Sequence, residues 1–291
     1  MEWIHPGPDV FRSCCARVQP VSPVYAPHLT RNGARRPLAW VAMTGAMTDD
    51  ERYRFDVQGF LVRRGALTLG EVTELTEAVH SLGIGSPSSH DIMSQRFSGH
   101  LARHPAFVTL LDHPAVIDIV VELCGATARL DHAYGIVMDP GNVGLDLHGG
   151  GHVWDPAQYY AVDRSGIHTG LLAVQWAISG SRPGDGGFAC VPGSHKAAFR
   201  PPRGMGLADP MVAEVPLGAG DVVVFTEALT HGTLPWRGAN QRRTLLYKYS
   251  PGPSAWSDDH DPPLGLQLGS LTVRQQRLFQ RPSVANHHPI A

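Results

Sequence analysis

The second half of the chain alternates short apolar runs with Gly/Pro turns, and this alternation constrains the fold more than any other feature. Turn sequences such as Asp139-Pro140-Gly141 separate the runs, and no helical pattern lies between them. Strands that follow one another in this way pair in antiparallel fashion, so the sequence predicts a sandwich or barrel. The runs, rich in Val, Leu, Ile, Tyr and Trp, span residues 129–138, 171–178, 187–191, 221–225 and 244–249.

Two helical patterns come before these strands. Thr68 and Glu71 have the spacing of a capping box, and apolar residues with a helical period follow them. A second helix is expected over residues 114–124, because Pro114 suits a first turn and Gly125 suits a helix end. Helices that precede a set of antiparallel strands pack on one face of the sheet, so we expect an α+β protein that is mostly β.

Composition and chain organisation narrow the range of functions. The 291 residues carry a formal net charge of −2, which provides no basic field for a nucleic-acid polymer. No apolar stretch approaches the roughly 18 residues of a membrane span and no secretory leader is visible, so we expect a cytoplasmic protein without a membrane partner. We expect an irregular arm over residues 1–46 and a single domain over residues 47–291. The domain divides into a helical part (47–128), a β core (129–251) and a C-terminal tail (252–291).

The common enzyme motifs are absent, and one ordered set of segments carries the chemical signal. The chain has no GxxxxGK[ST], HExxH or GxSxG sequence. The β-rich half contains His-Gly-Gly at 148–150, Pro-Gly-Ser-His-Lys at 192–196, and a Gly-Asp-Val-Val-Val-Phe strand at 220–225 that leads to His231. Arg242 follows His231 by eleven residues.

This ordered set resembles the phytanoyl-CoA dioxygenase-like branch of the Fe(II)/2-oxoglutarate-dependent oxygenases, over about residues 47–251. The resemblance implies a double-stranded β-helix core of the jelly-roll or cupin-like kind, with flanking N-terminal helices. It also implies a catalytic domain that uses Fe(II), O₂ and 2-oxoglutarate on a small-molecule substrate, in natural product biosynthesis.

The resemblance also assigns residues. His148 and His231 are expected to bind iron from different strands, and imidazole suits Fe(II). The distal carboxylate of 2-oxoglutarate needs a buried cation, for which a forked guanidinium is suited. Only one of two neighbouring strand residues points inward, and the family offset of eleven residues from His231 favours Arg242, with Arg243 as the alternate. The residues expected to line the cosubstrate pocket are Thr233 and Trp176.

One position departs from the family pattern. Family members that hydroxylate carry an acidic residue two positions after the first histidine, whereas this chain has Gly150, which has no side chain to bind a metal. In this respect the chain resembles the halogenases of the superfamily, in which chloride takes the vacated position. We therefore rank chlorination of an unactivated aliphatic C–H bond first. This interpretation predicts that Gly150→Asp abolishes halogenation.

Two other interpretations stay open. Asp146 lies two residues before His148, on the same side of an extended strand, and Asp155 lies in the loop that follows. Either can supply the missing carboxylate, which gives a hydroxylase. The third interpretation is a binding protein without turnover. Product mass in chloride and bromide separates the first two, and the absence of succinate with any candidate substrate marks the third.

The segment after the first histidine predicts a lid over the substrate. Trp154 and Tyr159 provide aromatic rings there, and Arg200 follows the Pro-Gly-Ser-His-Lys turn. A planar ring can stack on such aromatics, and a basic residue can meet an anionic group. We therefore expect a free anionic natural-product or nucleotide precursor as the substrate. The sequence predicts no oligomeric state.

Overall fold

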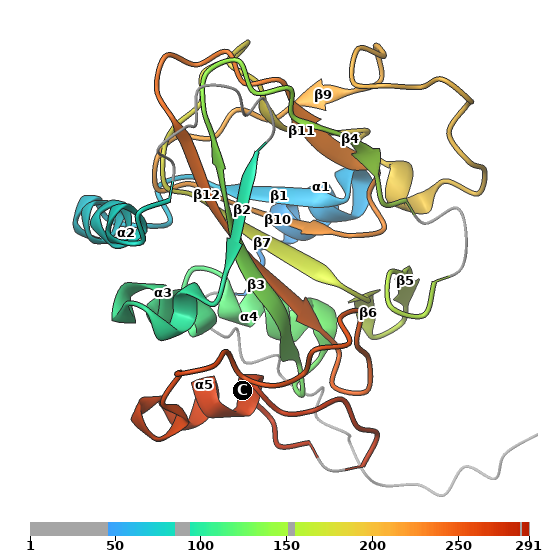
Figure 1. The fold of residues 1–291 in the computed structure, drawn as a ribbon. Coiled ribbons are helices and arrows are strands. Elements are labelled where there is room, and N and C mark those ends of the chain that lie inside the picture. Colours follow the sequence, from blue (N-terminus) through green and yellow to red (C-terminus); the bar gives the residue numbers. More distant parts are fainter. Residues whose placement is uncertain (1–45, 85–93, 151–154, 286, 291) are drawn as a thin grey trace, which may run out of the picture. The chain divides into compact units, whose positions relative to one another are not determined.

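Two antiparallel sheets form the centre of the protein (Figure 1). The computed structural model describes residues 46–84, 94–150, 155–285 and 287–290, and its helices and strands all lie in one unit, Ala42–Ala291. The six-stranded sheet has the order β1-β10-β7-β12-β3-β2, with β1 (Phe60–Arg63), β10 (Val222–Thr226), β7 (Leu172–Ala177), β12 (Arg242–Ser250), β3 (Arg129–Met138) and β2 (Gln95–Ser98). The four-stranded sheet has the order β4-β11-β8-β9, with β4 (Leu145–His148), β11 (His231–Leu234), β8 (Gly187–Cys190) and β9 (Ala213–Glu214). A separate hairpin joins β5 (Tyr160–Asp163) to β6 (Gly166–Thr169).

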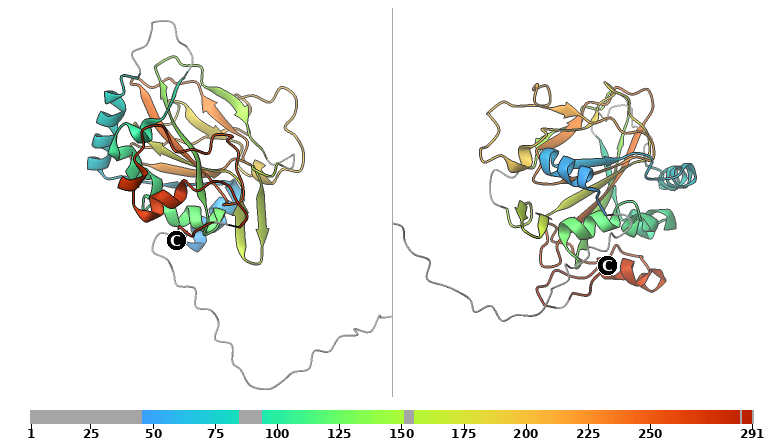
Figure 2. Two further views of the ribbon diagram at one scale, coloured as in Figure 1. Left: turned by 60° about the horizontal axis from the view of Figure 1, so that its bottom comes forward. Right: turned by 180° about the vertical axis from the view of Figure 1, so that it is seen from behind.

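Helices α3 (Pro105–Thr109), α4 (Ile117–Cys124) and α5 (Val273–Leu278) cover the side of the six-stranded sheet that faces away from the four-stranded sheet. Figures 1 and 2 show α3, α4 and α5 on the opposite side of this unit from β4, β9 and β11. The capping box predicted at Thr68 is present, since its hydroxyl accepts from the Glu71 N–H and the Glu71 carboxylate accepts from the Thr68 N–H. The helices are α1 (Asp49–Gln58), α2 (Leu69–Ser81), α3 (Pro105–Thr109), α4 (Ile117–Cys124) and α5 (Val273–Leu278). This arrangement confirms the α+β, mostly β, jelly-roll-like fold.

Strand β7 shows how the two apolar layers are divided. Leu172, Val174 and Trp176 pack with the helices, whereas Ala173 and Ala177 pack in the space between the two sheets. Successive strand residues point to opposite faces, and both faces of this strand are buried. The strand is therefore apolar at every position except Gln175, as expected for a strand that is buried on both faces. Within the described ranges, no helix is long and apolar enough to cross a membrane.

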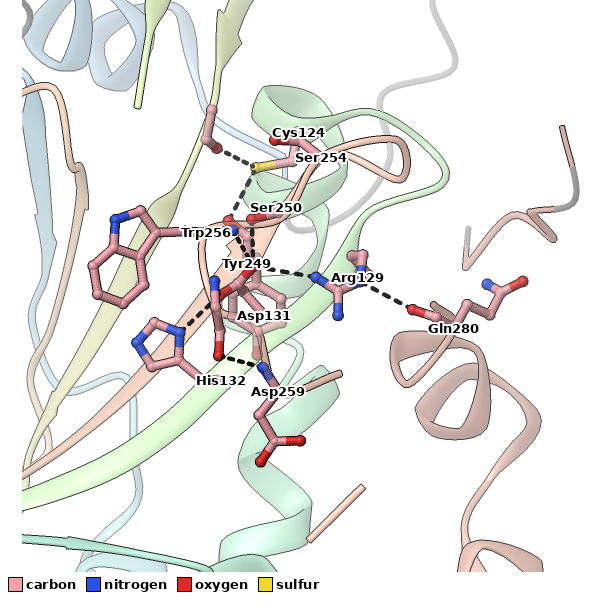
Figure 3. A network of polar contacts seen from close by, with 12 residues as sticks. Cys124, Arg129, Asp131, His132, Tyr249, Ser250, Ser254, Trp256, Asp259 and Gln280 are labelled. Atoms are coloured by element: carbon pink, nitrogen blue, oxygen red, sulfur yellow. Dashed lines mark hydrogen bonds and ion pairs between the residues drawn. The ribbon is translucent and has the colours of Figure 1, made fainter. Parts of the chain in front are cut away.

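A buried carboxylate joins the C-terminal tail to the six-stranded sheet (Figure 3). Asp131 on β3 accepts hydrogen bonds from Arg129, His132 and Ser250, and from the backbone N–H groups of Trp256 and Ser257. Burial alone would raise the pKa of this carboxyl, but these hydrogen bonds outweigh it and lower the pKa to about 2. The network fixes the beginning of the tail beside β3 and β12.

Candidate functional site

Two histidines face each other where strands β4 and β11 pair. His148 ends β4 and His231 begins β11, and the two are direct partners in the register. Their ring centroids lie 4.2 Å apart. His231 is buried, whereas His148 is exposed, so the pair stands where the interior meets solvent.

Both rings are held by hydrogen bonds of the same kind. Nδ1 of His231 lies 2.7 Å from the Leu229 carbonyl oxygen, and Nδ1 of His148 lies 2.9 Å from that of Asp146. A carbonyl oxygen only accepts, so each Nδ1 donates, and Nε2 is the ring nitrogen left for another partner. Burial lowers the pKa of His231 to about 4. Two imidazoles oriented in this way are suitable ligands for a transition metal.

The glycines after His148 allow the backbone of the next segment to approach closely. Gly149 and Gly150 have φ angles of 73° and 106°, which L side chains rarely adopt. A Cβ on Gly149 would lie 2.7 Å from the Leu229 oxygen and 2.8 Å from the Glu227 oxygen. The N–H of Gly150 points to the same Glu227 oxygen at 3.4 Å. The His-Gly-Gly sequence therefore packs directly against the backbone that leads into His231.

Glu227 brings a carboxylate to this place, and the sequence analysis missed it. Its side chain is buried, and Oε2 lies 3.9 Å from Nε2 of His231, while Oε1 forms an ion pair with Lys248 on β12. Burial alone would raise the pKa of Glu227, but the charge and the hydrogen bond of Lys248 contribute most to lowering this pKa to about 2. The signal in the sequence was a single acidic residue between a buried strand and the histidine, where apolar residues prevail.

Arg242 is a buried cation without an anionic partner. It lies on β12, and the hydrogen bond of its guanidinium goes to the sulfur of Met138 at 3.2 Å. Among the described residues no carboxylate forms an ion pair with it, and burial lowers its pKa to about 10. A Cβ on Gly187 would lie 2.9 Å from its Nε, so this glycine provides room for the arginine. A dicarboxylate cosubstrate is a suitable anion for this guanidinium.

The alternate, Arg243, points to the other side of β12. Its Nε donates to the side-chain oxygen of Gln241, and its backbone N–H donates to the Ser179 hydroxyl. Thr233 shares a face of β11 with His231, two residues away, and is half-buried. The structure therefore brings Thr233 to the side of the site.

Other predicted residues lie elsewhere. Trp176 packs on the helix side of β7, with its ring centroid 5.0 Å from that of His113, and does not fit the expected role in the cosubstrate pocket. Gln175 is its neighbour on the opposite, inner face, and both faces of β7 are buried. Tyr159 is half-buried and lies near Cys124, at the end of α4. Trp154 lies outside the described residues.

Neither alternate carboxylate contacts the histidine side chains in the described structure. Asp146 is exposed and provides only its carbonyl oxygen to His148, while the carboxylate of Asp155 accepts from the Ala157 N–H at 2.8 Å. In the part of the chain that is described, no group of three or more His, Cys, Asp or Glu side chains gathers closely enough to hold a metal ion. The pair His148 and His231 is thus the nearest approach to a metal site.

Two further features surround the pair. Ser194 of the Pro-Gly-Ser-His-Lys turn accepts from the Thr230 N–H at 2.8 Å and so positions the start of β11. Thr230 and the exposed Arg200 line a groove of about 340 Å³, together with Phe199, Met205 and Met211.

A row of rings leads from His231 to the surface. Phe225 has its ring centroid 4.8 Å from that of His231, and Lys248 Nζ lies 5.4 Å from the Phe225 ring and 6.0 Å from the Tyr134 ring. The rings of Tyr134 and His132 are stacked, and Trp256 lies 5.3 Å from His132 and is 52% exposed. Phe225 and Lys248 are buried, so the accessible ring surface of this row lies at Tyr134, His132 and Trp256.

Comparisons with known proteins agree with this geometry. The sequence pattern that defines the family described as phytanoyl-CoA dioxygenase (PhyH) matches residues 55–244. A crystal structure of HygX from Streptomyces hygroscopicus with nickel and 2-oxoglutarate bound is similar over 76% of this chain and 94% of its own, with 25% identity and a TM-score of 0.67. The carbocyclase SnoK from nogalamycin biosynthesis is similar in fold over 71% of this chain and 85% of its own, with 21% identity and a TM-score of 0.55. None of the curated proteins matches the chain.

Proposed function

Because the chain belongs to the phytanoyl-CoA dioxygenase family, we propose that it is an Fe(II)- and 2-oxoglutarate-dependent oxygenase that oxidises a C–H bond of a small natural product. The observation that carries this proposal is the pair His148 and His231, whose Nδ1 atoms are both occupied and whose Nε2 atoms are left for a metal. Bound iron, with O₂ and 2-oxoglutarate, supplies the oxidising power, and the cosubstrate leaves as succinate and CO₂.

The residues of this chain bind, orient and shield the reactants. His148 and His231 would hold the iron, and Arg242 would bind the distal carboxylate of 2-oxoglutarate by a bidentate hydrogen bond. Thr233 would line the cosubstrate pocket from β11. The buried rings of Phe188 and Phe225, with centroids 4.7 Å apart, exclude water on the inner side of His231.

The substrate is proposed to lie on the row of rings. Flat rings at the surface take a ligand that itself has ring surface. A HygX structure contains hygromycin B, and a structure of the epimerase SnoN contains nogalamycin RO, which supports a natural product as the substrate class. The groove beside Thr230 and Arg200 offers a second place for substituents of the substrate.

The experiment that tests the function compares two adjacent arginines. Purified protein with Fe(II), O₂ and 2-oxoglutarate is expected to form succinate. Arg242→Gln is expected to raise the KM for 2-oxoglutarate at least about tenfold, because a charged hydrogen-bond partner is lost from a buried place. Arg243→Gln, on the opposite side of the strand, serves as the control and should change it less than twofold. No succinate with any candidate substrate would indicate a binding protein instead.

Chlorination is the second candidate, and Gly150 is the observation that favours it. Gly150 has a φ angle of 106° and no side chain, so a chloride ion has room at the position that an acidic residue fills in hydroxylating relatives. Turnover in chloride and then in bromide distinguishes the two functions by the mass of the product. A halogenated product that persists unchanged in Gly150→Asp would refute a halide site at this residue.

A further inference from the structure

We infer that Arg96 binds an anionic group of the substrate, a carboxylate or a phosphate, at the end of the row of rings opposite to Trp256. The inference rests on the proposed function and deepens it, because it names the substrate as a small molecule that combines ring surface with a negative charge. It concerns the substrate and not the cosubstrate, for which Arg242 is the proposed partner.

Strand β2 carries Arg96 to the face of the six-stranded sheet that bears the row of rings. β2 is an edge strand of this sheet and pairs with β3 (Figure 1). Phe97 points to the helix side, where its ring packs in the core and fills the place above Gly135 that a side chain would need. Ala133 packs on the helix side as well. Successive strand residues point to opposite faces, so Arg96 and Tyr134 share the face away from the helices.

The register places Arg96 and His132 on opposite sides of Tyr134. Arg96 pairs with Ile136, two residues after Tyr134, whereas His132 lies two residues before it. Residues two apart on a strand share a face and lie about 6.6 Å from each other, so these side chains follow one another along β3. The Cζ atom of Arg96 lies 3.7 Å from the Tyr134 ring centroid, and the His132 ring stacks on Tyr134. Arg96 therefore ends the row on one side, as Trp256 does on the other.

The contact with Tyr134 uses only the flat face of the guanidinium. With Cζ at 3.7 Å, an edge directed at the ring would bring a nitrogen well inside van der Waals contact. The ring attracts the cation and holds it flat, while the N–H donors lie in the plane of the guanidinium and are directed past the ring. A fork of donors oriented in this way matches the two oxygens of a carboxylate or phosphate.

The charge of Arg96 is not balanced within the part of the chain that the structure describes. Its side chain is exposed, and no carboxylate of the described residues forms an ion pair with it. Lys248, whose Nζ lies 6.0 Å from the same Tyr134 ring, already has Glu227 as its partner. The two cations repel each other, and one carboxylate neutralises only one of them. The surface beside Tyr134 is therefore left with a positive charge that a bound anion can neutralise.

The test measures the binding of two probes that differ in charge. 2-Naphthoate and 2-naphthamide have the same ring system, and only 2-naphthoate is an anion at neutral pH. Each is titrated into the full-length protein by ligand-observed NMR, for the wild type and for Arg96→Gln. The wild type is expected to bind 2-naphthoate at least about fivefold more tightly than 2-naphthamide, and Arg96→Gln is expected to lose this preference. Equal affinities in the wild type, or a preference that Arg96→Gln retains, would overturn the inference.

Two further arginine variants control for the kind and the place of the charge. Arg96→Lys keeps the charge without the fork and is expected to retain a preference of about twofold. Arg164→Gln removes an exposed arginine from the turn of the β5–β6 hairpin and should leave the affinity for 2-naphthoate within about twofold of the wild type. A loss in Arg164→Gln as large as that in Arg96→Gln would contradict the inference, because the effect would then follow the net charge of the protein.

A third probe distinguishes the two anionic groups. 2-Naphthyl phosphate is titrated in the same way, and the group that Arg96 binds is the one whose affinity falls in Arg96→Gln. A loss of affinity for either anion supports the inference, and a loss for neither overturns it.

Arg242→Gln separates this inference from the proposed function. The preference for 2-naphthoate is expected to persist in this variant, since Arg242 is buried on β12. A preference that disappears in Arg242→Gln and remains in Arg96→Gln would mean that the probe occupies the cosubstrate place, so that only the present inference is wrong. Absence of succinate would refute the proposed turnover alone, because the binding of 2-naphthoate needs neither iron nor O₂.

Discussion

Asp131 and Glu227 are both buried carboxylates at the ends of strands, and they differ in how fully they are satisfied. Within the described structure, Asp131 accepts five hydrogen bonds, two of them from backbone N–H groups (Figure 3). Glu227 has the Lys248 ammonium on one oxygen and faces an imidazole with the other. A carboxylate with every lone pair in use stabilises the fold, whereas one with an oxygen left over marks the place where something else binds.

The largest effect is expected when His231, which faces Glu227, is replaced. His231→Ala should lower succinate formation at least about 1,000-fold, or about 4 kcal/mol, because the metal loses a buried ligand. The measurement is the rate of succinate release at saturating 2-oxoglutarate. His168→Ala is the control, since His168 is half-exposed and bonds to Ser165 and Asp163 on its own hairpin. A His231→Ala rate within tenfold of the wild type would remove the histidine from the site.

The next effect concerns stability and distinguishes the two carboxylates directly. Asp131→Ala should lower the free energy of unfolding by about 3–5 kcal/mol, because Arg129 stays buried without its partner. Glu227→Gln/Lys248→Met should lose less than about 1.5 kcal/mol, since both charges are removed together and neither is left buried without a partner, whereas Asp131→Ala also removes acceptors for backbone N–H groups. Urea denaturation measures both. Equal losses of unfolding free energy in the two variants would mean that both carboxylates act mainly to stabilise the fold.

A smaller effect is expected from pH. The pKa of Asp131 is lowered to about 2, below its value in the unfolded chain, so its contribution is complete at neutral pH and is lost as pH falls from about 4 to about 2. The shift corresponds to about 2 kcal/mol. Between pH 6 and pH 3, the urea midpoint of unfolding should fall less in Asp131→Asn than in the wild type. Parallel pH dependence in the two proteins would exclude Asp131 as the titrating group.

The smallest effect is expected at the exposed end of the row of rings. Trp256→Ala should raise the KM for the substrate about 2–10-fold with kcat within twofold, because one stacking surface is lost. The backbone N–H of residue 256 still donates to Asp131 in this variant, so the tail keeps its place. Steady-state kinetics gives both constants, and an unchanged KM would place the substrate elsewhere, with the groove beside Thr230 as the next region to test.

Much of the fold was predictable from the sequence, because strands in a packed core are long and apolar. The expected strand 129–138 coincides with β3, while β12 starts at Arg242 instead of residue 244. The two histidines were expected on different strands, but the apolar pattern did not give the bounds of β4 and β11, since each has four residues and one of them contains a glycine. They matter most for function, because their register places His148 opposite His231.

The site residues were predictable only where their spacing along the sequence matches the family pattern. The spacing from His231 favoured Arg242 over Arg243, and the structure places Arg242 inside. Because successive strand residues point to opposite faces, Gln175 and Trp176 must lie on different sides of β7. Both sides of β7 are buried, so the sequence does not show which of the two residues faces the site. Glu227 was hidden for a different reason, since its partner Lys248 is 21 residues away and only the folded chain brings the two together.

The left-handed backbone at Gly150 has a consequence for engineering this scaffold. An aspartate placed there inherits a conformation that costs a non-glycine residue about 1–3 kcal/mol, in a segment whose N–H stands against the backbone oxygen of Glu227. A carboxylate restored at the position used by hydroxylating relatives therefore starts from a strained backbone. Any gain from that carboxylate has to exceed this cost before the variant is useful.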